Sequence, residues 1–216
     1  SALTISGTLT NSGTLTLEDD SNTLSIIGSG SVRTFSGGDI DYNTNAVTLT
    51  RIAYAPAVSL DEAGDRINLG DSNCAFADIS IGVGGVISTF NAGSYNYSIS
   101  GNFSNTATGV YTQSASSIAT FTGSSKTIAS GGDSFYSITI ADGASISIAT
   151  DDLTVAGNLV IGLGASGQLD TNSMNLNVTG TTGISSGATL YLDGASAVSA
   201  LTISGTLTNS GTLTLE

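Results

Sequence analysis

Apolar and polar residues alternate along this chain in short runs that are separated by glycine-containing breaks. Near its start, Thr and Ser alternate with the apolar residues Leu3, Ile5, Leu9, Leu15 and Leu17. A period of two over short runs, rich in β-branched residues, is typical of half-buried β-strands. The nearest candidate for a helical stripe is 58–69, and Gly64 interrupts it. The pattern predicts an all-β protein.

A strand motif that ends in glycine recurs along the chain. The copies read LTISGTL, LSIIGSG, YSISGNF, IATFTGS, LTVAGNL, LNVTGTT and LTISGTL, and they begin at Leu3, Leu24, Tyr97, Ile118, Leu153, Leu176 and Leu201. The starts at 3 and 24 and those at 97 and 118 differ by 21 residues, those at 153 and 176 by 23, and those at 176 and 201 by 25. Repeats of about 20–25 residues built from short strands are typical of solenoids. The spacing predicts a parallel β-helix (β-solenoid) with coils of about 20–25 residues, and we expect its glycines to supply positive φ at the bends.

A much longer repeat lies over this short one. Residues 1–18, SALTISGTLTNSGTLTLE, return without a substitution at 199–216. We interpret 1–198 as one tandem-repeat unit of a continuous solenoid and 199–216 as the start of the next identical unit. Neither copy carries a pattern that would cover an open strand edge, so we expect a solenoid that is uncapped at both ends. With coils of ~22 residues, one unit holds about nine coils and advances ~43 Å.

The composition argues against several classes of partner. The chain has 28 Gly, one Pro, no His, and four Lys and Arg against 17 Asp and Glu, for a net charge of −13. Binding to nucleic acid or to anionic lipid depends on Lys and Arg, so neither partner is expected. No apolar run approaches the ~18 residues that span a bilayer, and we expect no membrane insertion of this segment.

The sequence also bears on where the protein acts. Cys74 is the single cysteine, so we expect no intrachain disulfide and no cysteine-based zinc site, and we interpret Cys74 as a small buried apolar residue. There is no signal-peptide pattern and the only methionine is Met174, as in an internal fragment or a processed chain. Few cysteines with many Ser and Thr suit an extracellular bacterial protein.

Carboxylates are the candidate catalytic groups, because the absence of His excludes imidazole chemistry. The acidic clusters are Asp19/Asp20, Asp39/Asp41, Asp61/Glu62/Asp65 and Asp151/Asp152. Asp39 and Asp41 share one face of a predicted strand, and a polysaccharide-cleaving β-helix enzyme needs two carboxyl groups at a controlled separation. The clusters stand beside Gly, Ser and Asn, so we interpret them as solvated turn residues. Their spacing matches no calcium-binding loop, and we expect no catalytic residue, cofactor or metal site.

Two residue types raise the question of carbohydrate contact. Tyrosines stack on sugars where they are exposed, whereas between coils they stack on one another, which we expect for Tyr42, Tyr95, Tyr97, Tyr111, Tyr136 and Tyr191. Asn96, Asn102 and Asn177 each begin an Asn-x-Ser/Thr triplet, the short acceptor pattern for glycans.

Glycine clusters and threonine pairs have structural interpretations as well. Gly82–Gly85 and Gly162–Gly167 precede no helical pattern and lack the Lys-Ser/Thr of a phosphate loop, so we interpret them as corners. The threonine pairs are Thr8/Thr10, Thr14/Thr16, Thr48/Thr50 and Thr120/Thr122. Regular outward threonines would suit an ice-binding surface, but here they are scattered, so we interpret them as the outer face of ordinary strands.

At LTISGTLTNSGTLTL and LTVAGNLVIG the chain resembles the stalk regions of very large bacterial surface proteins, the filamentous-haemagglutinin-like and autotransporter adhesins. The resemblance covers most of the chain. It implies a right-handed parallel β-helix, secretion, surface display and a structural or adhesive role. The unchanged return of residues 1–18 at 199–216 departs from that pattern and favours fibre building over receptor recognition.

Together these observations predict a structural repeat of an extracellular filament or surface stalk without enzyme activity. Its expected partners are further copies of itself, joined end to end or side by side. The alternatives are an adhesin stalk, a carbohydrate- or ice-binding solenoid and, more remotely, a polysaccharide-cleaving β-helix enzyme. A surface or carbohydrate ligand stays open.

Overall fold

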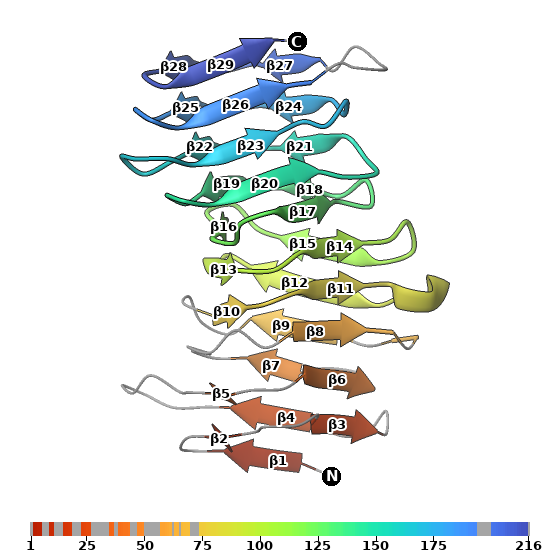
Figure 1. The fold of residues 1–216 in the computed structure, drawn as a ribbon. Coiled ribbons are helices and arrows are strands. Elements are labelled where there is room, and N and C mark those ends of the chain that lie inside the picture. Colours follow the sequence, from red (N-terminus) through yellow and green to blue (C-terminus); the bar gives the residue numbers. More distant parts are fainter. Residues whose placement is uncertain are drawn as a thin grey trace. The chain divides into compact units, whose positions relative to one another are not determined.

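A computed structural model describes residues 57–61, 63–64, 66–69, 74–193 and 200–215, together with the backbone of seven short strands before residue 57. The chain divides into two compact units, Ser1–Ser117 and Ile118–Glu216. Each unit is a stack of short parallel strands (Figure 1). In the described part of the chain the only helical element is the 3₁₀ turn η1 (Val83–Gly85). The predicted all-β parallel solenoid is therefore confirmed.

The first unit contains strands β1 to β15. A six-stranded sheet runs in the order β1-β4-β7-β9-β12-β15, beside the series β3-β6-β8-β11-β14 and the pairs β2-β5 and β10-β13. The strands are β1 (Ala2–Ile5), β2 (Leu9–Thr10), β3 (Leu15–Glu18), β4 (Thr23–Ile26), β5 (Phe35–Ser36), β6 (Asp39–Asn43), β7 (Val47–Leu49), β8 (Ala57–Leu60), β9 (Arg66–Leu69), β10 (Cys74–Phe76), β11 (Ile79–Ile81), β12 (Thr89–Gly93), β13 (Tyr97–Ile99), β14 (Phe103–Asn105) and β15 (Val110–Gln113).

The second unit contains strands β16 to β29 in three parallel series. These are β16-β19-β22-β25-β28, β17-β20-β23-β26-β29 and β18-β21-β24-β27, so each coil contributes one strand to each series. The strands are β16 (Ile118–Phe121), β17 (Lys126–Ala129), β18 (Ser134–Phe135), β19 (Ser137–Ile140), β20 (Ser145–Ile148), β21 (Leu153–Val155), β22 (Leu159–Ile161), β23 (Gln168–Asp170), β24 (Leu176–Val178), β25 (Thr182–Ile184), β26 (Thr189–Leu192), β27 (Leu201–Ile203), β28 (Leu207–Asn209) and β29 (Thr212–Leu215).

The strand register agrees with the sequence repeat. Leu3 lies opposite Leu24 in the first unit, and Leu153, Leu176 and Leu201 lie opposite one another in the second. These are the alignments that the strand–glycine motif predicts. Other coils are shorter than these, since Ile40 pairs with Val58 and Ile118 pairs with Ser137. The right-handed sense of the helix stays a prediction.

The core of each unit is a column of inward-facing side chains, because successive residues of a strand point to opposite faces. In the second unit, Ile146, Leu169 and Leu190 lie one above the next and are all buried. In the first unit, the described core includes Cys74, which is fully buried as expected. The ring-bearing core residues there are Phe76, Phe90, Tyr97, Phe103 and Tyr111.

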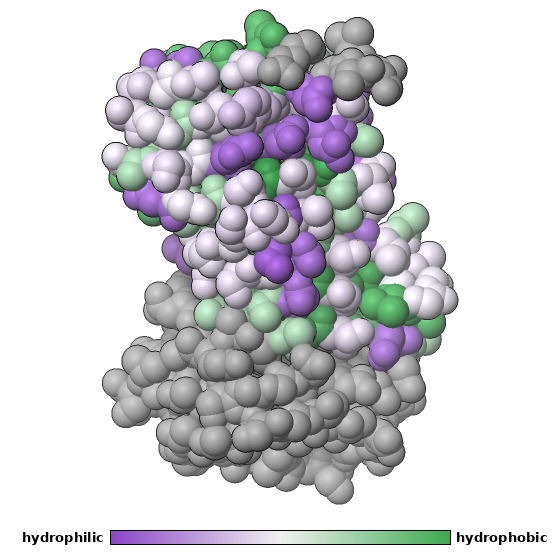
Figure 2. Space-filling view, in the orientation of Figure 1, coloured by the Kyte–Doolittle hydropathy of each residue, from purple (hydrophilic) through white to green (hydrophobic). Residues whose placement is uncertain are grey.

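The outer faces carry mixed polar residues. On the face seen in Figure 2, the described surface is mostly pale or purple, with isolated green residues. Outward positions in one series read Thr154, Asn177 and Thr202. Large apolar side chains that the description shows as exposed are Val83, Ile87, Val110, Leu163, Leu207 and Leu215. The last two of this set belong to the last coil, β27 to β29.

Candidate functional site

Corners in the second unit are closed by a ladder of side-chain hydrogen bonds between coils. Asp152 accepts hydrogen bonds from the backbone N–H and the Nδ2 of Asn175, each at 2.9 Å. The Oδ1 of Asn175 accepts a hydrogen bond from the Ala200 N–H, also at 2.9 Å. The Asn175 side chain and then its backbone N–H hold the pKa of Asp152 below its ordinary value. Each side chain thus satisfies a backbone donor that the next coil exposes where it turns.

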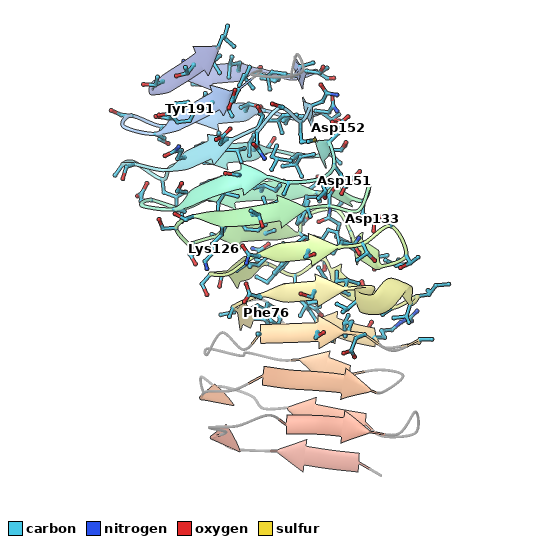
Figure 3. All side chains as sticks on the ribbon, turned by 45° about the vertical axis from the view of Figure 1, so that its right-hand side comes forward. Phe76, Lys126, Asp133, Asp151, Asp152 and Tyr191 are labelled. Carbon is cyan, nitrogen blue, oxygen red and sulfur yellow. The ribbon has the colours of Figure 1, made fainter. Side chains whose placement is uncertain are left out.

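Other carboxylates at corners make the same kind of contact. Asp78 accepts a hydrogen bond from the Asn102 N–H at 2.6 Å, and Asp142 accepts one from the Leu163 N–H at 2.7 Å. Asp151 accepts one from the N–H of Gly131 at 3.1 Å. Figure 3 shows Asp133, Asp151 and Asp152 along one edge of the second unit. The acids that make these bonds act as bridges between neighbouring coils.

The remaining acidic candidates are not brought into a described site. Asp39 and Asp41 lie on β6, of which only the backbone is described. Asp61 is exposed just after β8. Asp19, Asp20, Glu62 and Asp65 lie outside the described residues. Within the described residues, no group of three or more Asp, Glu or Cys side chains is arranged to hold a metal ion.

The glycine of the strand motif is required by a close approach between coils, not by a left-handed backbone. A Cβ on Gly180 would lie 2.5 Å from the carbonyl oxygen of Gly157, and one on Gly205 would meet the carbonyl oxygen of Gly180. None of these glycines has φ in the left-handed region. Our expectation of positive φ is therefore wrong at this column, although it is confirmed at corner glycines such as Gly82 and Gly162.

Two tyrosines of the first unit are buried and bonded to each other. The hydroxyl oxygens of Tyr97 and Tyr111 lie 2.7 Å apart, and Tyr111 donates to Oε1 of Gln113 at 2.8 Å. Tyr111 has only one hydroxyl proton, so Tyr97 is the donor between the two rings. Burial, together with the neighbouring Tyr111, raises the pKa of Tyr97 well above its ordinary value. Both rings pack against Phe90 inside the core and present no surface to a sugar.

The other tyrosines differ from this pair. Tyr95, Tyr136 and Tyr191 are half-buried, and the side chain of Tyr42 is outside the description. The glycan triplets begin at Asn96 and Asn102 in the first unit and at Asn177, on the outer face of β24. Neither these tyrosines nor these asparagines come together around a groove in the described part of the chain.

Threonines do not form a regular array on the described faces. In the series that begins with β16, one outward-facing position reads, from coil to coil, Thr120, Thr139, Val160, Gly183 and Thr208. Thr122 is exposed beyond the end of β16. The side chains of Thr8, Thr10, Thr14, Thr16, Thr48 and Thr50 are outside the description. The described ladders are mixed, as expected for the ordinary outer face of a strand.

One threonine points inward. Thr182 is fully buried in the column between Leu159 and Leu207, and its Oγ1 has no hydrogen-bond partner among the described residues. Sequence reasoning missed this residue. The sequence predicts that Asn, Ser and Thr at corners satisfy exposed backbone groups, but it does not single out Asn175 or Asn158, whose Oδ1 accepts a hydrogen bond from the Thr181 N–H at 2.9 Å. A signal for the bridges exists, because Asp152 and Asn175 each stand directly before the Leu of a strand–glycine motif.

The two copies of the eighteen-residue sequence form the same coil. Residues 1–18 contain β1, β2 and β3, and residues 199–216 contain β27, β28 and β29 at corresponding positions. In the first copy the strands pair with β4, β5 and β6 of the following coil. In the second copy they pair with β24, β25 and β26 of the preceding coil. One sequence is therefore seen with each of its two edges paired.

The chain was also compared with known proteins. Comparison with protein-family models, with curated proteins and with solved structures gave no match. In the part of the chain that the structure describes, no helix is long and apolar enough to cross a membrane. The assignment of function therefore depends on the fold and on the residues described above.

Proposed function

We propose that this chain is a structural repeat of an extracellular filament or surface stalk and that it has no catalytic activity. The observation that carries the proposal is the recurrence of one coil: the same sequence forms the same three strands at 1–18 and again at 199–216. A coil that returns unchanged serves as a building block. In solenoids each repeat contacts its neighbours, so stability and length both grow by adding repeats.

The use of polar groups supports a structural role. Asp78, Asp142 and Asp152 each accept a backbone hydrogen bond from the neighbouring coil. Enzymes of this fold class need carboxyl groups that converge on a substrate. Here these three corner carboxylates are engaged in joining coils, which favours a filament over a polysaccharide-cleaving enzyme.

The extracellular setting is supported by composition and resemblance. The strand patterns LTISGTL and LTVAGNL are similar to those of bacterial surface stalks, and the parallel β-solenoid, which is the coarser part of the fold that this similarity implies, is present. The low content of Lys and Arg also leaves few sites for trypsin-like proteases. An external structural protein benefits from that resistance.

Antibody labelling of the source cells tests this proposal. Antibodies raised against the purified chain should decorate filaments or stalks on intact, unpermeabilised cells, viewed by electron microscopy with gold-labelled secondary antibody. Brief treatment of intact cells with a broad-specificity protease should leave these structures in place while it removes flexible surface proteins. Label that appears only after permeabilisation would overturn the proposal.

A further inference from the structure

The corner between β20 and β21, in the second unit, turns on one strained residue. Thr150 is exposed and has a φ of 69°. The Asp151 N–H donates a hydrogen bond to the carbonyl oxygen of Ala149 at 2.9 Å, across Thr150. A hydrogen bond of that span around a residue with positive φ is typical of the classic γ-turn, which is rare and strained. A β-branched residue is an outlier in this conformation, so the backbone at Thr150 carries strain.

The equivalent corners of the neighbouring coils do not carry it. The corner of the preceding coil is a four-residue turn, closed by a hydrogen bond from the Asp133 N–H to the Ser130 carbonyl oxygen at 3.2 Å. The corner of the following coil is closed in the same way, from the Met174 N–H to the Thr171 carbonyl oxygen at 2.9 Å. Neither of these turns places a β-branched residue at positive φ. The strain at Thr150 is therefore a property of one coil and not a requirement of the fold.

Hydrogen bonds to the preceding coil hold both sides of the strained turn. The Ala149 N–H donates to the carbonyl oxygen of Ile128 at 2.8 Å. On the other side, Oδ2 of Asp151 accepts a hydrogen bond from the Gly131 N–H at 3.1 Å. Strain of this kind persists where the surroundings hold it in place, and strained residues gather at functional sites. The corner is therefore a candidate for chemistry as well as for structure.

The side chains of this corner form a nucleophile and a base. Oγ1 of Thr150 donates a hydrogen bond to Oδ2 of Asp151 at 2.8 Å. A threonine hydroxyl can reach the carbonyl carbon of the preceding residue, because only the amide nitrogen, Cα and Cβ lie between them. An adjacent base activates a hydroxyl nucleophile, and an N–H aimed at the carbonyl oxygen stabilises the charge that develops there. Asp151 supplies the base with its side chain and the N–H donor with its backbone.

We propose that Thr150 cleaves the peptide bond that joins it to Ala149. Oγ1 of Thr150 attacks the carbonyl carbon of Ala149 while the Asp151 carboxylate takes the hydroxyl proton. The negative charge on the Ala149 oxygen is stabilised by the Asp151 N–H. The carbon–nitrogen bond then breaks, and Asp151 passes the proton to the departing amine of Thr150, which leaves an ester between the two residues. Water hydrolyses this ester, so that Ala149 ends in a carboxylate and Thr150 has a free amino group and its hydroxyl again.

The surroundings of the corner favour both steps. Breaking the peptide bond releases the strained turn, which offsets part of the cost of exchanging an amide for an ester. Because Thr150 is exposed, water reaches the ester. The stack stays joined after the cut, since β20 pairs with β17 and β23 while β21 pairs with β18 and β24. The reaction occurs once in each chain and turns over no substrate, so it goes beyond the proposed filament function and does not depend on it.

Mass spectrometry of the purified full chain tests the proposal. The chain is kept at neutral pH for several days and then denatured, because the two pieces remain associated in the folded stack. Pieces 1–149 and 150–216 should accumulate, the second beginning with Thr-Asp-Asp-Leu. Hydroxylamine attacks esters, so adding it should speed the cleavage and leave a hydroxamate on Ala149. An intact chain, both with and without hydroxylamine, would overturn the proposal.

Four variants separate the roles of the corner residues. Thr150→Val keeps the branched shape without the hydroxyl and should abolish cleavage, whereas Thr150→Ser restores a hydroxyl and should be cut. Asp151→Asn should slow cleavage at least tenfold, because general bases contribute about that much or more. Asp152→Asn is the matched control, since its carboxylate bonds to Asn175 instead, and its rate should stay within about twofold of the parent. Circular dichroism checks that each variant keeps its strand content.

The chain also contains an internal control in the first unit. Ser116 follows an alanine, is exposed and has a φ of 87°. However, the next residue is Ser117 and not an acid, and the Ser117 N–H donates to the carbonyl oxygen of Ser114. The bond before Ser116 should therefore stay intact. Cleavage of Thr150→Val at the parent's bond and rate would overturn the proposal, because it would show hydrolysis that needs no hydroxyl.

Discussion

The first unit packs a cluster of five aromatic rings into its described core, whereas the second, apart from the pair Phe121 and Phe135, packs its described core with aliphatic columns. In the first, Phe90 touches three rings: Phe76 with centroids 5.5 Å apart, Tyr97 at 5.7 Å and Tyr111 at 6.2 Å. In the second unit, aliphatic side chains of neighbouring coils lie one above the next, as in the column of Leu153, Leu176 and Leu201. Both cores fill the same narrow interior of a coil, yet they hold neighbouring coils in register by different means.

In the aromatic core, register is set by ring geometry and hydroxyl bonding. Phe103 and Tyr111 meet edge to face at 5.2 Å, and the hydroxyl chain from Tyr97 through Tyr111 ends on Gln113. Edge-to-face pairs add free energy beyond burial alone. In the aliphatic core, branched side chains have no such preference, so the corner hydrogen bonds between coils carry more of the register. The contrast predicts that the first unit is most sensitive in its core and the second at its corners.

The largest effect is expected from Phe90→Ala. It removes the ring that contacts Phe76, Tyr97 and Tyr111, so the free energy of unfolding should fall by about 3–5 kcal/mol. Leu176→Ala in the aliphatic core should cost about 2–4 kcal/mol, toward the lower part of the range for such changes. Urea unfolding followed by circular dichroism measures both. Equal losses of unfolding free energy in the two variants would mean that the ring–ring contacts of Phe90 add no stability beyond the burial of its side chain.

The next effect is expected at the glycine column of the second unit. Gly180→Ala forces a Cβ against the carbonyl oxygen of Gly157, so the coils must separate at that corner, at a cost of about 1–3 kcal/mol. Gly183→Ala is the matched control in the adjacent strand, because a Cβ there meets nothing within 4 Å. It should leave stability unchanged or raise it by up to about 1 kcal/mol through the unfolded chain. A loss at Gly183 equal to that at Gly180 would contradict the close-approach explanation.

The glycine column also shows what the sequence can and cannot predict. Period-two alternation and the recurring Leu-x-Val/Ile-x-Gly pattern were enough to predict the parallel solenoid and the register of Leu153, Leu176 and Leu201. The reason for the glycine was missed, because the carbonyl of Gly157 that excludes a Cβ from Gly180 belongs to the preceding coil. Contacts across a coil depend on coil length, and that length varies from one turn to the next.

The same limit applies to the corners. Asp152 was correctly placed at a turn, but its bond to Asn175 depends on both residues standing one position before aligned strands. Whether Asp39 and Asp41 take part in chemistry stays a prediction, since only the backbone of β6 is described. The tyrosines are a third case, because the sequence alone gives the same expectation for all of them. Only the strand register shows that Tyr97 and Tyr111 are buried and that Tyr191 is half-buried.

A smaller effect, opposite in sign, is expected from Thr182→Val. The buried Oγ1 lies in an apolar column between Leu159 and Leu207 and has no described hydrogen-bond partner. Valine has nearly the same shape and no polar atom, so the free energy of unfolding should rise by about 1 kcal/mol. Thr182→Ser is the control, because it keeps the hydroxyl and removes a methyl group, and it should destabilise. A valine variant less stable than the parent would show that the hydroxyl is satisfied in solution.

The smallest effect on stability is expected at the corner that contains Asp152, and it is measured through its dependence on pH. The two hydrogen bonds from Asn175 favour the carboxylate, so the pKa of Asp152 in the folded chain lies below its value in the unfolded chain. A lowered folded pKa means that the stabilisation is present above the unfolded pKa, near ~4, and is lost as pH falls through the folded pKa. Because Asp152 is exposed, the change in stability is small, and the titration itself is the sharper measurement.

Nuclear magnetic resonance of the Asp152 carboxyl carbon should give a pKa below the ordinary value, and Asn175→Ala should return it upward by removing the side-chain bond. The backbone N–H of residue 175 remains in that variant, so the return should be incomplete. If Asn175→Ala leaves the titration of Asp152 unchanged, the side-chain hydrogen bond at this corner does not form. The argument that corner hydrogen bonds set the register of the aliphatic coils would then lose its basis.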